Sequence, residues 1–376
     1  MTSETIKECF KKWGFRENPF TETYLADFWA RPDKDLNFLK FLLSNSRDQN
    51  ELLNILIRGE YGSGKTYMLK FLKGYIENKL DGLGIYFQIP RKYRLQGFRD
   101  ILAEFVRAIG IENLEKLGKE IAEKEGIHEF DVLKDFLIDY PLDGDVAIAI
   151  ANLVYDNDYA LTSAWLFGNS TIHQDRAIGM ISSTKDESTI IKLIANLIYL
   201  LNWKYNIVGI FIDEFENLSG ESQASKSIKE GFRNLYDELL ENEKRGSIAI
   251  ITAITARLEF EITSSIGTAF LDRITYNFSL APLEEENSKK YIQHLFSYYR
   301  ENADTSLIPP FADTAAIDLF IKTFPTTKAV SLTSRGAVRT PRRIMKSGTI
   351  LLTRACSEQV KEINSEFILR TLGQET

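Results

Sequence analysis

The segment GEYGSGKT, residues 59–66, constrains the fold of this chain more than any other part of the sequence. It matches the pattern G-x-x-x-x-G-K-[ST] in full, follows the short apolar run 52–57 and opens a predicted helix over 65–79. A glycine-rich turn between a buried strand and a helix lets consecutive backbone N–H groups converge on phosphate oxygens, and the helix N-terminus adds positive potential. The pattern therefore predicts a phosphate-binding loop on a parallel sheet.

The side chains of this loop predict the ligands as well as the fold. Lys65 is expected to bridge the β and γ phosphates of ATP, and the Thr66 hydroxyl is expected to bind Mg²⁺. ATP and Mg²⁺ are therefore the predicted cofactors. The residues expected to line the nucleotide are Gly59, Glu60, Tyr61, Gly62, Ser63, Gly64, Lys65, Thr66 and Tyr67.

A second element lies at residues 207–218, IVGIFIDEFENL, where an apolar strand ends in acids. Asp213 is predicted to hold the magnesium, usually through water, and Glu214 to polarise the attacking water as a general base. An apolar strand that ends in acids is common by itself, and the complete phosphate-binding loop is what favours the catalytic interpretation. Glu216 is better explained as a solvated loop residue.

Polar residues at the end of the predicted strand 247–255 form a third element. In a parallel sheet the active site lies at the carboxyl ends of the strands. Thr255 is therefore a candidate for contact with the γ-phosphate or the attacking water, and Thr252 a weaker one. Threonine is also a good strand residue in its own right, so a purely structural explanation stays open.

Two arginines are candidates for the positive charge that phosphoryl transfer requires in its transition state. Arg273 lies in AFLDRITYNFSL, and Arg342 opens a predicted helix just after Pro341, a favoured first helical residue. Each could equally form a surface ion pair. Arg343, beside Arg342, is more simply a surface charge.

The order of elements predicts an α/β fold, a P-loop NTPase sheet of parallel strands with helices on both faces. Residues 98–205 show apolar positions three and four apart and are predicted to be a mostly helical insertion. The predicted domains are an N-terminal segment (1–45), an ATPase core (46–282) and a helical lid (283–376). The predicted strands cover residues 52–57, 84–90, 206–213 and 247–255.

Bulk composition limits the partners. A net charge of -7 excludes a protein coated in positive charge, so DNA contact is expected only through local basic patches. RKYR (91–94) is one such patch, although a solvated loop explains it more simply. We expect Cys9 and Cys356 to be reduced thiols. No apolar run is long enough for a membrane span, and the N-terminus lacks an apolar signal core, so a cytoplasmic protein is expected.

Three further segments carry a resemblance to a known family. WGFRENPF (13–20), residues 270–295 and TPRRIMKSGTILLTRA (340–355) resemble AAA+ ATPases of the ExeA, TnsC and origin-recognition group. The resemblance implies that residues 28–35 pack on adenine and that the helical lid closes over the nucleotide.

The same resemblance implies roles for single residues. Thr255 matches the polar residue called sensor 1, and Arg342 matches the lid arginine called sensor 2. Arg273 is the candidate for an arginine that reaches into the neighbouring subunit's ATP, which implies a homo-oligomer. AWLFGNSTIHQDRAIGM (164–180) is similar to ATP-binding proteins of BREX-type phage-defence islands.

These observations predict an ATP-hydrolysing AAA+ protein that oligomerises and drives or regulates a DNA-processing partner. The setting would be phage defence, a mobile element or replication. An ATP-dependent signalling or scaffold switch with little turnover is the main alternative, and a small-molecule kinase is a weaker one. Glu214 favours hydrolysis, because a protein that only binds ATP does not need a general base.

Overall fold

The computed structural model describes residues 3–21, 28–32, 36–91, 95–140, 142–241, 246–256, 259–322 and 339–373. The chain divides into two compact units. The loop unit comprises Met1–Leu36, Gly59–Tyr67 and Leu280–Thr376, and the sheet unit comprises Asn37–Arg58 and Met68–Ser279. This division groups the phosphate-binding loop with segments from both ends of the chain, whereas the predicted domains are three consecutive ranges. The predicted domain limits therefore remain a prediction.

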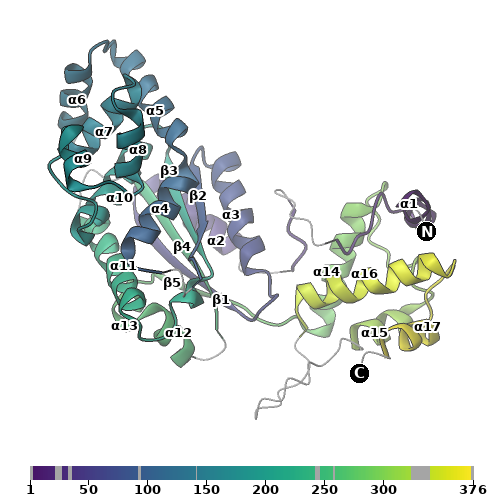
Figure 1. Ribbon diagram of the computed structural model, residues 1–376. Helices are drawn as coiled ribbons and strands as arrows, with labels where there is room; N and C mark the ends of the chain where they lie inside the picture. The colour runs from purple at the N-terminus through teal and green to yellow at the C-terminus, as the bar shows by residue number, and fades with distance from the viewer. Residues whose placement is uncertain are drawn as a thin grey trace. The chain divides into compact units, whose positions relative to one another are not determined.

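The sheet is five-stranded and all-parallel, in the order β2-β3-β4-β1-β5, which confirms the predicted fold class (Figure 1). The strands are β1 (Leu52–Gly59), β2 (Leu83–Gln88), β3 (Ile207–Asp213), β4 (Ser247–Thr255) and β5 (Tyr276–Leu280). β5 was not predicted. It is a five-residue edge strand whose residues alternate between covered and exposed positions, so it lacks the continuous apolar run of the inner strands.

Helices cover both faces of the sheet, and the register shows which face each helix meets. Gly84 pairs with Gly209, so both lie on one face. A Cβ atom at Gly209 would lie 2.5 Å from Cδ1 of Ile76 on α3 (Lys65–Lys79), so the glycine permits the close approach of this helix. On the opposite face the ring of Phe87 meets that of Phe105 on α4 (Phe98–Ile109), with centroids 6.4 Å apart.

The helical block predicted over 98–205 is confirmed as the run from α4 to α10. Its core forms because helices such as α4 bury an apolar stripe, and α10 is buried on nearly all sides. The helices that belong mainly to the sheet unit are α2 (Leu36–Gln49), α3 (Lys65–Lys79), α4 (Phe98–Ile109), α5 (Ile111–Glu125), α6 (Phe130–Asp139), α7 (Gly144–Val154), α8 (Tyr159–Leu166), α9 (Ile172–Ala177), α10 (Glu187–Asn202), the 3-10 helix η2 (Phe215–Leu218), α11 (Gln223–Glu241), α12 (Glu259–Ile266) and α13 (Thr268–Leu271).

The loop unit has its own aromatic core. Phe20 and Phe296 meet edge to face with centroids 5.7 Å apart, which joins the N-terminal segment to α14. A disulfide links Cys9 of α1 to Cys356 of α16, so the expectation of two reduced thiols is wrong. The helices of this unit are α1 (Ser3–Lys12), α14 (Glu285–Tyr299), α15 (Thr314–Lys322), α16 (Pro341–Ser357) and α17 (Ser365–Leu372).

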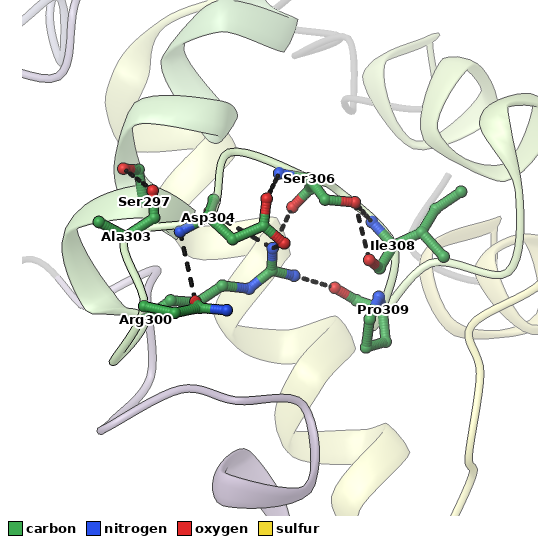
Figure 2. Close-up of polar contacts among 8 residues, drawn as sticks. Ser297, Arg300, Ala303, Asp304, Ser306, Ile308 and Pro309 are labelled. Carbon is green, nitrogen blue, oxygen red and sulfur yellow. Dashed lines mark hydrogen bonds and ion pairs between the residues drawn. The ribbon is translucent and has the colours of Figure 1, made fainter.

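A buried arginine organises the loop that follows α14 (Figure 2). Arg300 donates to the Ser306 carbonyl at 2.6 Å, to the Asp304 carboxylate at 3.1 Å and to the Pro309 carbonyl. Its guanidinium also stacks on Phe15, 5.0 Å from the ring centroid. These contacts satisfy a charge that would otherwise be costly to bury, so the role of Arg300 is structural.

Candidate nucleotide-binding site

The phosphate-binding loop joins the end of β1 to the start of α3, as the sequence predicts. Gly62 and Gly64 have φ angles of +79° and +102°, a region that side chains disfavour. The Lys65 ammonium donates to the Gly59 carbonyl at 3.0 Å and to the Glu60 carbonyl at 3.2 Å. The Lys65 amine therefore lies folded against its own loop, where phosphate oxygens are expected to bind.

The N-terminal segment also rests on this loop. The Tyr67 hydroxyl donates to the Phe28 carbonyl at 2.6 Å, and the buried Arg31 guanidinium donates to the Ser63 carbonyl at 3.0 Å. The first residues of the segment predicted to pack on adenine thus contact the phosphate-binding loop. Residues 33–35 lie outside the described residues. Arg31 had no signal in the sequence, because it belongs to no motif.

The start of α16 contacts the phosphate-binding loop directly. Thr340 caps this helix, and the Arg342 backbone N–H donates to the Gly62 carbonyl at 3.2 Å. The Arg342 guanidinium donates to the Tyr61 hydroxyl at 2.6 Å and lies 4.9 Å from the centre of its ring. The predicted lid arginine and the predicted phosphate-binding loop are therefore neighbours within the loop unit.

At the end of β3, the Asp213 carboxylate is held from two sides. The Tyr86 hydroxyl donates to Oδ2 at 2.9 Å, and the Glu214 backbone N–H donates to Oδ1 at 2.9 Å. Gln88, two residues along β2, donates to the Tyr86 oxygen at 3.1 Å. Burial, and then the charge of Asp213, raise the pKa of Tyr86, so the phenol remains a proton donor.

Glu214 adopts an uncommon backbone conformation at the start of η2, with a φ of +56° and an exposed side chain. The Asn217 amide donates to the Glu214 carboxylate at 3.3 Å and to the Ile89 carbonyl at 2.9 Å. A polar residue thus contacts the predicted general base. A cleft of about 810 Å³ lies beside Glu214, and its polar lining residues are Lys70, Tyr86, Gln88, Arg91, Glu104, Arg107 and Glu214.

The end of β4 is tied to the same turn. The Thr255 backbone N–H donates to the Glu216 carboxylate at 3.0 Å, so the expectation that Glu216 is merely solvated is wrong. The turn of η2 brings this side chain back to the strand end. Thr252 is only 1% exposed, and its hydroxyl has no hydrogen-bond partner among the described residues. Of the two candidates, only Thr255 lies at the strand end.

Arg273 is anchored within its own chain. Its guanidinium donates twice to the Asp237 carboxylate of α11, at 2.6 and 2.7 Å, and once to the Ala269 carbonyl. Its backbone carbonyl accepts a hydrogen bond from the Asn54 amide at 3.1 Å. A role toward a neighbouring subunit would require the guanidinium to exchange partners, and that role remains a prediction.

The donor chemistry fits magnesium. Thr66 presents a hydroxyl in the first turn of α3, and Asp213 presents a carboxylate at the end of β3, and both are the hard oxygen ligands that Mg²⁺ prefers. Across the described part of the chain, no group of three or more His, Cys, Asp or Glu side chains could hold a metal by itself.

Two of the sequence expectations concern surfaces rather than the site. Residues 92–94 of the basic patch RKYR lie outside the described residues, and Arg91 lines the cleft beside Glu214. Within the described ranges, no helix has the length and apolar character needed to cross a membrane.

Comparison with known proteins identifies a family for most of the chain. The KAP family P-loop domain matches residues 37–347. No curated protein matches the chain.

Solved structures match the fold at low sequence identity. The Aeropyrum pernix ORC2 protein in its ADPNP–ADP complexes aligns with a TM-score of 0.56 and 11% identity, covering 95% of this chain and 71% of that one. Its ADP form aligns with a TM-score of 0.55 and 11% identity, covering 96% and 73%. The Drosophila ORC bound to DNA aligns with a TM-score of 0.49 and 9% identity, covering 100% and 67%.

Proposed function

Because the chain belongs to the KAP family of P-loop NTPases, we propose that it binds ATP with Mg²⁺ and hydrolyses the γ-phosphate. The observation that carries the proposal is the phosphate-binding loop, which holds the Lys65 ammonium and the Arg342 guanidinium against its own backbone and side chains. Phosphoryl transfer is accelerated mainly by positioning and by positive charge placed where negative charge develops. The nucleotides in the Aeropyrum ORC2 structures also favour an adenine nucleotide.

Each site residue then has a specific task. Lys65 and Arg342 neutralise the phosphates, and Glu214 accepts a proton from the attacking water. Thr66 and Asp213 would hold Mg²⁺, which supplies further positive charge to the phosphate oxygens. Thr255, at the end of β4, would contact the γ-phosphate or the attacking water.

Steady-state phosphate release from ATP tests this proposal. We expect Lys65→Ala to lose most of the activity of the unmodified protein, because the variant lacks the positive charge that neutralises the phosphates. Full activity in this variant would contradict the proposal.

We further propose that the protein forms a homo-oligomer with ATP and drives or regulates a DNA-processing partner. The resemblance of residues 13–20, 270–295 and 340–355 to origin-recognition ATPases supports this, with phage defence, a mobile element or replication as the setting. Size measurement with and without a slowly hydrolysed ATP analogue, for the unmodified protein and Arg273→Ala, tests the assembly. A monomer under both conditions would contradict it.

The contact between Asn217 and Glu214 supports a second candidate, an ATP-dependent switch with little turnover. The Asn217 amide occupies a carboxylate oxygen of Glu214 that the attacking water would otherwise use. Single-turnover hydrolysis separates the candidates, because equal rates for the unmodified protein and Glu214→Gln would favour the switch.

A further inference from the structure

Tyr61 occupies a position of the phosphate-binding loop where the sequence pattern demands no particular side chain. The residue is 73% exposed, so burial in a core does not explain its aromatic side chain. The backbone alone would suffice to bind phosphate here, so the side chain needs another explanation.

The contacts of Tyr61 provide that explanation. Its hydroxyl accepts a hydrogen bond from the Arg342 guanidinium at 2.6 Å, and its ring lies 4.9 Å from the guanidinium carbon. A guanidinium has five N–H donors, so a bond to a phenol and a bond to a phosphate are compatible. Ring contact at this distance adds a cation–π attraction.

The backbone and the side chain of Arg342 are held separately. The Arg342 N–H donates to the Gly62 carbonyl, and a Cβ atom at Gly62 would lie 2.9 Å from Cβ of Arg342, so the start of α16 rests on the loop whatever the side chain does. The guanidinium, at the end of a flexible chain, depends on its own contacts for its position. Tyr61 supplies two of them.

We infer that Tyr61 is a positioning residue that holds the Arg342 guanidinium at the phosphate-binding loop and so strengthens binding of ATP relative to ADP. The inference rests on the proposed function, in which Arg342 neutralises the phosphates, and it assigns the Arg342 guanidinium to the γ-phosphate. Only ATP carries that phosphate. An arginine already restrained at the loop therefore raises the affinity for ATP and leaves the affinity for ADP unchanged.

A double-mutant cycle tests the inference. Affinities for ADP and for a slowly hydrolysed ATP analogue are measured in Mg²⁺ for the unmodified protein, Tyr61→Ala, Arg342→Ala and the double variant. We expect Tyr61→Ala to lower the ATP-to-ADP affinity ratio about two- to fivefold, the size of an exposed cation–π contact. The same change made in the Arg342→Ala background should leave the ratio unaltered.

Two more variants sharpen the test. Tyr61→Phe keeps the ring and removes the hydroxyl, so its ratio should fall between those of the unmodified protein and Tyr61→Ala. Arg343→Ala removes the neighbouring arginine of the same helix and serves as the matched control, with an unchanged ratio expected.

The outcomes separate the inference from the proposed function. An unchanged or higher ratio in Tyr61→Ala, beside a lowered ratio in Arg342→Ala, would overturn the inference alone. An unchanged ratio in Arg342→Ala would remove the γ-phosphate role of that arginine, and a protein that binds neither nucleotide would overturn the proposed function. An equal effect of Tyr61→Ala in both backgrounds would show that Tyr61 acts without Arg342, which also overturns the inference.

Discussion

The phosphate-binding loop and the acidic end of β3 are held in place by different parts of the chain. In the loop, Lys65 and Arg31 donate to backbone carbonyl groups. At the acidic end, side chains hold one another, since Tyr86 donates to the Asp213 carboxylate and Asn217 donates to that of the adjacent glutamate. Lys65 and Arg31 thus depend on backbone acceptors, whereas the two carboxylates at the acidic end depend on the identity of the side chains beside them.

This difference predicts how the loop and the acidic end each respond to substitution. A backbone carbonyl exists whatever residue occupies the position, so the loop loses function mainly when a cation is removed. A carboxylate held by a phenol or an amide changes when the donor alone is removed, even in a nearly isosteric variant. The predictions below test this contrast.

The largest effect is expected for Glu214→Gln, because an amide cannot accept the proton of the attacking water. Turnover should fall by about 100-fold or more. Binding of ATP should persist, since the phosphate-binding loop is unchanged. Rapid-mixing phosphate release and calorimetric titration measure the two quantities.

Glu104→Gln is the matched control for that measurement, because Glu104 lines the same cleft and pairs with Arg107 instead. A comparable loss of turnover in both variants would show that the cleft needs negative charge in general. It would then contradict a specific role of Glu214 as the base.

Removal of the Arg31 side chain tests the phosphate-binding loop. Arg31→Ala would leave the Ser63 and Ala281 carbonyls without this donor and should lower the free energy of unfolding by about 1–3 kcal/mol. Nucleotide affinity should fall with it, because the loop backbone loses a support. Chemical denaturation and nucleotide titration give the two values.

The surface residue Arg16 provides the comparison for Arg31, since its guanidinium also donates to a backbone carbonyl but is exposed. Arg16→Ala should change stability by less than about 0.5 kcal/mol. Equal destabilisation by the two substitutions would show that burial of Arg31 does not matter.

Local signals in the sequence predicted the phosphate-binding loop, the strands β1 to β4 and the helical block. Those signals are a complete motif and apolar runs of the right period, both of which act within a few residues. The edge strand β5 was missed because a short, half-exposed strand has no such run. Its first residue, Tyr276, is only partly buried.

Contacts between residues far apart in the sequence could not be predicted in this way. Tyr86 lies 127 positions from Asp213, and Cys9 lies 347 positions from Cys356. Neither pair follows a spacing rule, because the fold and not the local sequence brings the partners together. Glu216 was misjudged for a related reason, since only the turn of η2 returns it to the end of β4.

Tyr86→Phe is expected to have a smaller effect than Glu214→Gln or Arg31→Ala. The ring and its packing remain, but the Asp213 carboxylate loses the hydrogen bond that the Tyr86 hydroxyl donates and the orientation it fixes. The Mg²⁺ concentration needed for half-maximal ATP binding should rise about tenfold, the lower end for loss of a group that orients a metal ligand. Titration of Mg²⁺ against binding of a fluorescent ATP analogue measures it.

Tyr155→Phe is the matched control, because the Tyr155 hydroxyl is buried without a hydrogen-bond partner among the described residues. It should leave the Mg²⁺ requirement unchanged. If Tyr86→Phe also left the Mg²⁺ requirement unchanged, the phenol would not orient Asp213. The contrast between the loop and the acidic end would then weaken.

The smallest effect is expected for Asn217→Ala, and its sign decides between two functions of the contact. The amide donates to an exposed carboxylate at 3.3 Å, so the bond is weak. If it restrains the base, its removal should raise turnover about two- to threefold, the value of one modest hydrogen bond. Asn113→Ala, which removes an amide bonded to the Ile109 carbonyl in the helical block, is the control and should not change turnover. A fall in turnover for Asn217→Ala would mean that the amide aims Glu214 at the attacking water. The switch with little turnover would then lose the observation that favours it.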